Sequence, residues 1–185
     1  MPILPYVGDD ESHLEEVVQA TKDHGGRFIM AGGLTMDGVQ ADRTLQAANK
    51  FDPNMETRIR ELYQWHTDGK PQYSPPQAYN ARLGLSVREL CDRHGLLDRM
   101  PRYITPGPLA VNKRIAELLF LRTYDLELEG RTQYQIWAYR KAAWRVDELQ
   151  QSVADIYRER GEAGLQELPG IGGILSAQIA RWLEE

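Results

Sequence analysis

The spacing of apolar positions near the beginning of the chain predicts two kinds of element. Apolar runs at 2–7 and 27–34 are typical of short buried strands. Between them, Leu14 and Val18 recur at helical spacing, and the helix is expected to continue to about His24. A strand, a helix and a second strand joined by short loops form a βαβ unit, so we expect the two strands to be parallel.

The pattern after the second strand predicts helices only. We expect helices at about 38–50 and 54–68, then a loop, then two helices that are separated near Leu85 and stop before Gly95. Two parallel strands alone leave both sheet edges open. Residues 1–36 are therefore expected to be part of a larger parallel β/α barrel. That barrel is either truncated in this chain or completed by another chain.

Apolar residues at helical spacing continue through the last 75 residues, with glycines between the runs. Asn112 is expected to cap the first of these helices, and a further helix is expected at about 148–159. A hairpin is expected within 161–173, ahead of the last helix. These helices predict a compact all-α bundle.

Three prolines within 98–108 suggest the boundary between two domains. We place a linker at 105–110, between a first domain at 1–104 and a second at 111–185. The predicted fold class is α+β and mostly helical: a βαβ piece followed by helices, then the all-α bundle.

The loop Leu168–Gly172 has the helix-hairpin-helix pattern, a device that holds a nucleic-acid backbone without reading bases. Its glycines allow a tight turn with φ above zero, so Ile171 can point into a core. The amides of Gly170, Gly172 and Gly173 are then expected to face outward at the start of a helix, where phosphate binds. The alternative interpretation is a glycine-rich turn between two core helices.

Five further side chains are candidates to support a phosphate contact. They are Tyr139, Arg140, Lys141, Ser176 and Arg181. Each also has an ordinary structural explanation, since a tyrosine can pack in the bundle and cations on a helix face can simply be solvated. The tryptophans at 137, 144 and 182 are expected in the core rather than as base-stacking platforms.

Composition limits the classes of function. The chain has a net charge of −5, which argues against a protein that coats nucleic acid but allows a small, salt-dependent contact through backbone amides. The single cysteine, Cys91, excludes a disulfide framework and is typical of a reducing compartment. No apolar run approaches the ~20 residues that span a bilayer, so we expect no membrane partner and a cytoplasmic location.

The first domain resembles the last part of a radical S-adenosylmethionine protein of the DNA repair photolyase, or spore-photoproduct-lyase-like, branch. The residues that carry this resemblance are Pro2-Ile3-Leu4-Pro5, Gly8-Asp9, the helix from Leu14 to Gly25, Ala31-Gly32-Gly33-Leu34-Thr35, Asp52-Pro53 and Leu62-Tyr63. That family holds a [4Fe-4S] cluster on three cysteines in a Cys-x-x-x-Cys-x-x-Cys loop. With Cys91 alone, this chain is expected to use the cluster and S-adenosylmethionine only if a longer or partner chain supplies that loop.

The second domain is similar to the N-terminal eight-kilodalton domain of family X DNA polymerases over 110–185. The resemblance rests on Asn112-Lys113-Arg114-Ile115-Ala116, Leu126-Glu127-Leu128-Glu129-Gly130, Tyr134, Ala138-Tyr139-Arg140-Lys141-Ala142-Ala143 and the hairpin. It implies a domain that holds DNA ends and gaps.

Some members of that polymerase family remove a 5′-deoxyribose phosphate through a lysine that forms a Schiff base. The matching position here is Gln178, whose amide forms no imine. The family's phosphate-contacting lysines match Ile174 and Gln135, and no lysine follows Lys141. Lyase activity is therefore the least favoured of the functions considered.

The resemblances together predict a non-catalytic DNA-binding module, linked to or split from a radical S-adenosylmethionine repair-like protein. DNA and a barrel chain of that kind are the expected partners, and no cofactor or metal is expected on this chain alone. The alternative hypothesis is a protein–protein interaction module, motivated by the acidic charge balance and by the incomplete sheet. In that case, the first domain completes a barrel or a dimer.

Overall fold

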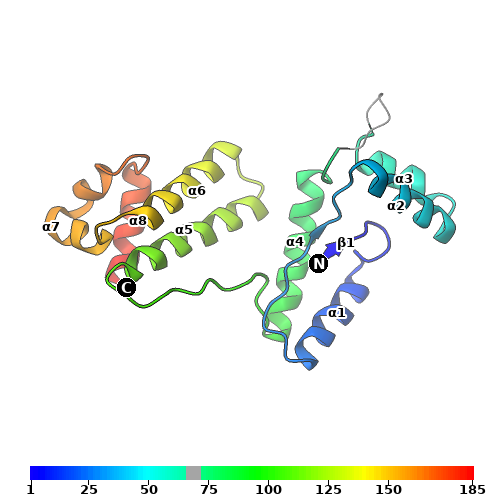
Figure 1. Cartoon of the computed structure of the whole chain (residues 1–185), viewed down its shortest axis with the longest axis horizontal. Coiled ribbons are helices and arrows are strands. Elements are labelled where there is room, and N and C mark those ends of the chain that lie inside the picture. The colour runs from blue at the N-terminus through cyan, green and yellow to red at the C-terminus, as the bar shows by residue number, and fades with distance from the viewer. Residues whose placement is uncertain (66–71) are drawn as a thin grey trace. The chain divides into compact units, whose positions relative to one another are not determined.

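The computed structural model describes residues 1–65 and 72–185, and the helices and the small sheet within them are shown in Figure 1. The chain divides into two compact units, Met1–Pro101 and Arg102–Glu185. Helices dominate both units and the described sheet is parallel and two-stranded, which confirms the mostly helical α+β class. Within the described residues, no helix has both the length and the apolar character needed to cross a membrane.

The sheet of the first unit is parallel, as predicted, but much shorter than the apolar runs. Strand β1 (Pro2–Ile3) pairs with β2 (Gly32–Gly33), and helix α1 (Glu11–Asp23) connects them. The chain turns directly after β1, because the amides of Val7 and Gly8 donate to the Leu4 carbonyl at 3.3 and 3.0 Å.

The other predicted strand is also shorter than expected, because its first residues pair elsewhere. The Ile29 amide donates to the Leu97 carbonyl at 2.8 Å, and Phe28 and Leu97 form an isolated parallel bridge. The apolar run at 27–34 is thus divided between two partners. Alternation of apolar residues does not determine which segment a strand pairs with.

Helix α4 (Gln77–His94) is continuous where two helices were predicted. Its buried residues keep one helical period along its whole length: Tyr79, Leu83, Val87, Leu90 and Cys91. Leu85 lies on the open side of the helix and does not mark a break. The helix ends as expected at Gly95, which has φ +68°, the left-handed conformation that glycine favours at a helix C-terminus.

Helices α2 (Gly38–Phe51) and α3 (Met55–Leu62) pack against each other and form a hydrophobic cluster separate from the one beside α4. Helix α3 is shorter than the predicted 54–68, because Tyr63 leaves the helix and is fully buried, with its hydroxyl donating to the Leu34 carbonyl. The predicted helix end beyond Trp65 and the first part of the predicted loop lie outside the described residues.

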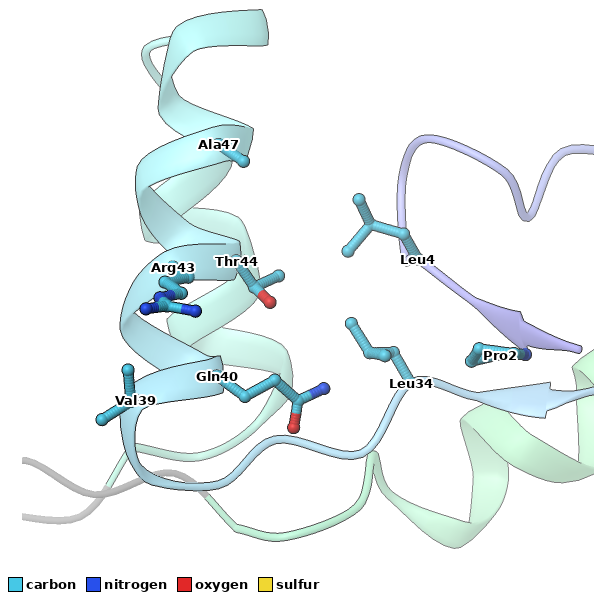
Figure 2. Close-up of a pocket in the computed structure, with 8 residues that line it drawn as sticks. All are labelled: Pro2, Leu4, Leu34, Val39, Gln40, Arg43, Thr44 and Ala47. Atoms are coloured by element: carbon cyan, nitrogen blue, oxygen red, sulfur yellow. The ribbon is translucent and has the colours of Figure 1, made fainter.

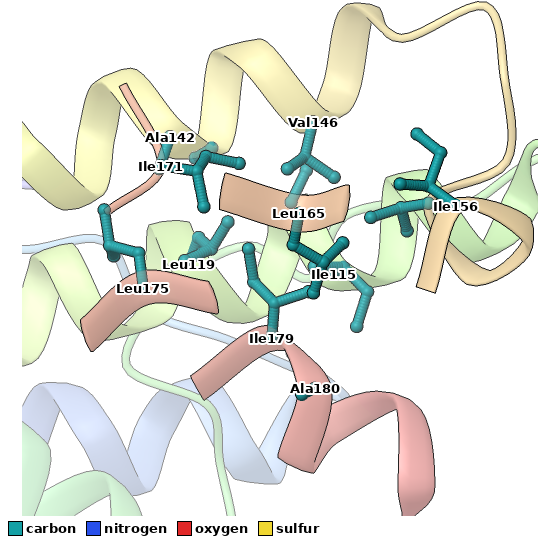
Figure 3. Packing of buried hydrophobic residues seen from close by; sticks show 13 residues of the cluster. Ile115, Leu119, Ala142, Val146, Ile156, Leu165, Ile171, Leu175, Ile179 and Ala180 are labelled. Carbon is teal, nitrogen blue, oxygen red and sulfur yellow. The ribbon is translucent and has the colours of Figure 1, made fainter. Parts of the chain in front are cut away.

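The second unit is built from four helices: α5 (Ala110–Leu128), α6 (Gln133–Glu148), α7 (Val153–Gln166) and α8 (Gly173–Glu184). Helix α5 contacts each of the other three. Their apolar faces form one core, and Figure 3 labels Ile115, Leu119, Ala142, Val146, Ile156, Leu165, Ile171, Leu175, Ile179 and Ala180 within it. The helical spacing predicted most of this core, but the helix expected at about 148–159 lies at Val153–Gln166 and takes up part of the segment 161–173 that was expected to hold the hairpin. Ile174, which the spacing placed with the apolar residues of the last helix, is 82% exposed.

The sequence suggested that Asn112 caps the first helix of the second unit. It does not, because α5 begins before it, at Ala110. Its side chain is fully buried and holds the turn between α6 and α7. The Oδ1 atom accepts from the Val153 amide at 2.7 Å, and Nδ2 donates to the carbonyls of Leu149 and Gln151 at 3.3 and 2.9 Å. Asn112 therefore supports the first turn of α7 from a neighbouring helix.

Candidate nucleic-acid interface

The loop between α7 and α8 is anchored by an apolar residue and turned by a glycine. Ile171 is 3% exposed and lies among core side chains of α5, α6 and α8 (Figure 3). Its amide donates to the Leu168 carbonyl at 3.0 Å. Gly170 has φ +84°, which residues with a β-carbon rarely adopt. The loop backbone is thus held at one point and turned sharply beside it.

Helix α8 begins without a side-chain cap. Gly172 occupies the N-cap position with φ −88° and ψ −179°, and its carbonyl accepts from the Ser176 amide at 2.9 Å. The first-turn amides, from Gly173 to Leu175, have no carbonyl four residues earlier within the helix. A β-carbon on Gly172 would meet open space. These amides and the helix dipole therefore form a positive, open end of α8.

Lys141 lies next to this loop, together with two residues that the sequence analysis did not select. A shallow pocket of about 360 Å³ is lined by Lys141, Trp144, Arg145, Glu148, Pro169 and Gly170. Trp144 and Arg145 follow Lys141 by three and four positions on α6, so helical spacing was the signal that places them on one face. The pocket joins cations of α6 to the hairpin backbone.

Arg140 lies on α6 as well, but its charge is already occupied. Its guanidinium pairs with Glu127 and lies 5.0 Å from the ring centroid of Trp137. Tyr139 is partly buried and packs against the bundle core, in agreement with its structural interpretation. Of the three neighbouring candidates on α6, only Lys141 lines the pocket at the hairpin.

Neither Ser176 nor Arg181 is exposed at the open end of α8: Ser176 is buried in the first turn, and Arg181 lies in the last turn. Ser176 is fully buried, and its hydroxyl donates to the Gly173 carbonyl at 3.0 Å while accepting from Gln166 at 3.1 Å. It is therefore a structural residue and not a surface contact. Arg181 lies on the last turn of α8, 3.9 Å from Glu185, and about 12 Å along the helix from Gly173.

The tryptophans divide between core and surface, and the expectation that all three lie in the core is wrong. Trp182 is partly buried against the core, as expected. Trp137 and Trp144 are 41% and 45% exposed, with ring centroids 6.0 Å apart. Both lie on α6 opposite its buried side, because the core of the second unit is filled by smaller residues of that helix, such as Ala142 and Val146.

Ile174 and Gln178, which the sequence resemblance compares with lysines of family X polymerases, carry no amine. Ile174 is 82% exposed at the start of α8, and Gln178 is partly buried one turn further on. An isoleucine side chain beside the open amides contributes neither charge nor a nucleophile.

The first unit has a pocket of about 520 Å³ between its sheet and α2. It is lined by Pro2, Leu4, Leu34, Val39, Gln40, Arg43, Thr44 and Ala47. Figure 2 shows Leu4 and Leu34 facing Gln40 and Thr44 of α2 across this pocket. Its lining is mainly apolar, so it suits an apolar side chain or segment better than a phosphate.

The cysteine of the first unit is not placed as a metal ligand. Cys91 is fully buried on α4, and burial raises the pKa of its thiol to about 11. Among the described residues, no three histidine, cysteine or carboxylate side chains come together as a metal-binding group.

Comparison with known proteins gives no relative from which to assign a function. No protein-family model matches the chain, and neither a curated protein nor a solved structure matches it.

Proposed function

We propose that the second unit is a non-catalytic DNA-binding module that holds the phosphate backbone at the loop between α7 and α8. The observation that carries this proposal is the open start of α8. A glycine without a capping side chain stands there, beside an anchored Ile171 and a left-handed Gly170. Backbone amides at such a helix start bind phosphate without reading sequence.

The charges around the loop support a weak contact. Lys141 and Arg145 line the adjacent pocket, and each adds attraction for a phosphate. Segment 110–185 nevertheless carries ten Lys and Arg against twelve Asp and Glu residues. Binding is therefore expected to be non-specific, measurable below ~100 µM at low salt, and lost steeply as salt rises.

Gly172 offers a sharp test, because an aspartate there would fill the N-cap and place its own carboxylate on the open amides. We expect Gly172→Asp to lower DNA affinity at least tenfold at low salt, and to raise the free energy of unfolding by about 1 kcal/mol. Fluorescence anisotropy with a labelled DNA duplex and single strand measures affinity, and urea denaturation measures stability.

The matched control is Gly172→Ala, which adds a β-carbon into open space at an ordinary backbone conformation. It is expected to keep DNA affinity within about threefold, since it leaves the amides uncovered. Equal affinity of the aspartate variant and the wild type would remove the helix start from the binding site.

The proposal gives this chain no catalytic step. Neither Ile174 nor Gln178 carries an amine that forms an imine with a sugar aldehyde. The resemblance of the first unit to radical S-adenosylmethionine repair proteins supports a role as the DNA-holding part of such a system. A separate or longer chain would then supply the cysteine loop.

A second candidate function is protein–protein interaction through the first unit. Its two-residue strands form a smaller sheet than parallel strands usually do, and an apolar pocket lies beside Leu4 and Leu34. A partner chain that completes this sheet region as a barrel, or a second copy, would cover that pocket.

A further inference from the structure

The outward face of α6 carries aromatic and cationic side chains next to one another. Trp137, Lys141, Trp144 and Arg145 fall at helical spacing, opposite the buried residues of the same helix. The two indole planes are tilted by 58° at 6.0 Å between centroids, and both side chains are more than two-fifths open to solvent. Large aromatic side chains usually bury most of their area, so this pair is available for a ligand.

Two cations of this face are unpaired: Lys141 and Arg145 form no ion pair with any residue of the described part of the chain. Arg140 pairs with Glu127 and lies over the Trp137 ring. Glu148 is the acidic residue that lines the same pocket. Because 110–185 is slightly acidic in total, this local excess of positive charge complements an anionic partner.

An unpaired nucleobase fits this combination better than an apolar protein surface does. Every base has a π-face that stacks on an indole, and the phosphates on either side of it are attracted by neighbouring cations. The pocket links Trp144 directly to Pro169 and Gly170 of the hairpin. A strand whose backbone lies at the hairpin would thus pass its bases along α6.

We propose that Trp137 and Trp144, flanked by Lys141 and Arg145, form a stacking site for unpaired bases of single-stranded nucleic acid. This inference rests on the proposed backbone contact at the hairpin, and it adds bases to the determinants of binding. Because the stacking site recognises bases and not strand ends, affinity is expected to be independent of a 5′-phosphate.

The test compares two dye-labelled twelve-residue oligonucleotides by fluorescence anisotropy at low salt. One is oligothymidylate, and the other has the same phosphates but abasic sugars at every position. The full chain is expected to bind oligothymidylate at least fivefold more tightly, since stacking of one base on one aromatic side chain corresponds to about 5- to 150-fold in affinity. Adding a 5′-phosphate is expected to change neither value.

Paired variants assign the effect to the two indoles. Trp137→Ala combined with Trp144→Ala is expected to remove the preference for bases, and Trp137→Phe combined with Trp144→Phe to retain part of it. The matched control is Tyr103→Ala, which removes an aromatic side chain that is 82% exposed outside this face. It is expected to leave both affinities within twofold, and circular dichroism checks that each variant keeps its helix content.

Three results would overturn the proposal that Trp137 and Trp144 form a stacking site. Equal affinity for the two oligonucleotides would leave the backbone contact standing and remove the role of bases. Absence of binding to any DNA would overturn the proposed function as well. A change of oligomeric state in the alanine variant, with no competition by oligothymidylate in the wild type, would make this face an interface between copies of the chain.

Discussion

At the scale of single residues, the interior of the first unit determines how Cys91 behaves. The thiol is fully buried among apolar side chains of α4 and its neighbours, and burial raises its pKa to about 11, with Asp98 and Asp92 adding to the shift. A thiolate is the reactive form of cysteine, so a protonated and buried thiol reacts slowly. Cys91 is therefore expected to be inert in the folded protein.

We predict that alkylation of Cys91 at pH 8 is at least about 100-fold slower in the native protein than in urea, because reaction requires opening of the core. The folded thiol also binds its proton more tightly than the ordinary pKa of 9.0 implies. Its contribution to stability is therefore complete below pH 9 and is lost as pH rises toward 11. Urea denaturation across this range measures the loss, and Cys91→Ala is expected to remove it. Similar alkylation rates in the two states would contradict the buried position.

At the scale of elements, α7 depends on one glycine. Gly161 has φ +61° and ψ −155°, a conformation that only glycine adopts readily, and it divides the helix into two segments. The second segment places Leu165 in the core, fully buried. Because Leu165 lies just ahead of the hairpin, the kink also determines where the loop at Gly170 leaves the bundle.

Gly161→Ala is expected to lower the free energy of unfolding of the second unit by about 1–3 kcal/mol, the usual cost of a strained backbone position. The strain comes from the backbone alone, since a β-carbon there meets open space. Gly173→Ala is the control, with a β-carbon 4.0 Å from its nearest neighbour in a helical position. It is expected to keep or slightly raise stability. An unchanged denaturation midpoint for Gly161→Ala would show that α7 does not need the kink.

At the scale of the whole molecule, each unit has its own core. The core of the second unit is drawn from α5, α6, α7, α8 and the hairpin, while the clusters of the first unit use residues up to Leu96. Such a division is typical of units that can fold separately. The two candidate functions are also divided in this way, since the proposed DNA contact lies in one unit and the apolar pocket in the other.

The segment 102–185 is therefore expected to fold alone and to bind DNA within about threefold of the full chain. Circular dichroism and urea denaturation measure its folding, and anisotropy measures its binding. Light scattering of the full chain and of the segment tests the second candidate function. A dimer that needs residues 1–101 and is broken by Val39→Asp in the apolar pocket would favour it. A segment that is unfolded, or folded but unable to bind DNA, would contradict the division of roles.

The sequence by itself determined the helical character of the second unit, the parallel sense of the two strands and the glycine turn ahead of α8. These follow from local signals: helical spacing, glycines at helix ends, and a short strand–helix–strand order. It also identified Ile171 as the apolar anchor of the loop, because the glycines on either side allow the backbone to turn so that this apolar side chain enters the core.

Tertiary packing alone decided the rest. Whether Asn112 caps its own helix or supports a neighbouring one depends on which loop lies beside it. The sequence suggested Ser176 as a phosphate contact and Trp144 as a core residue, yet Ser176 is fully buried and Trp144 is open beside Lys141. Helical spacing places a residue on a face, but only the packing of the other helices decides whether that face is covered. The turn at Gly170 and the buried Ile171 agree with the sequence pattern, and the binding surface proposed around them extends onto α6.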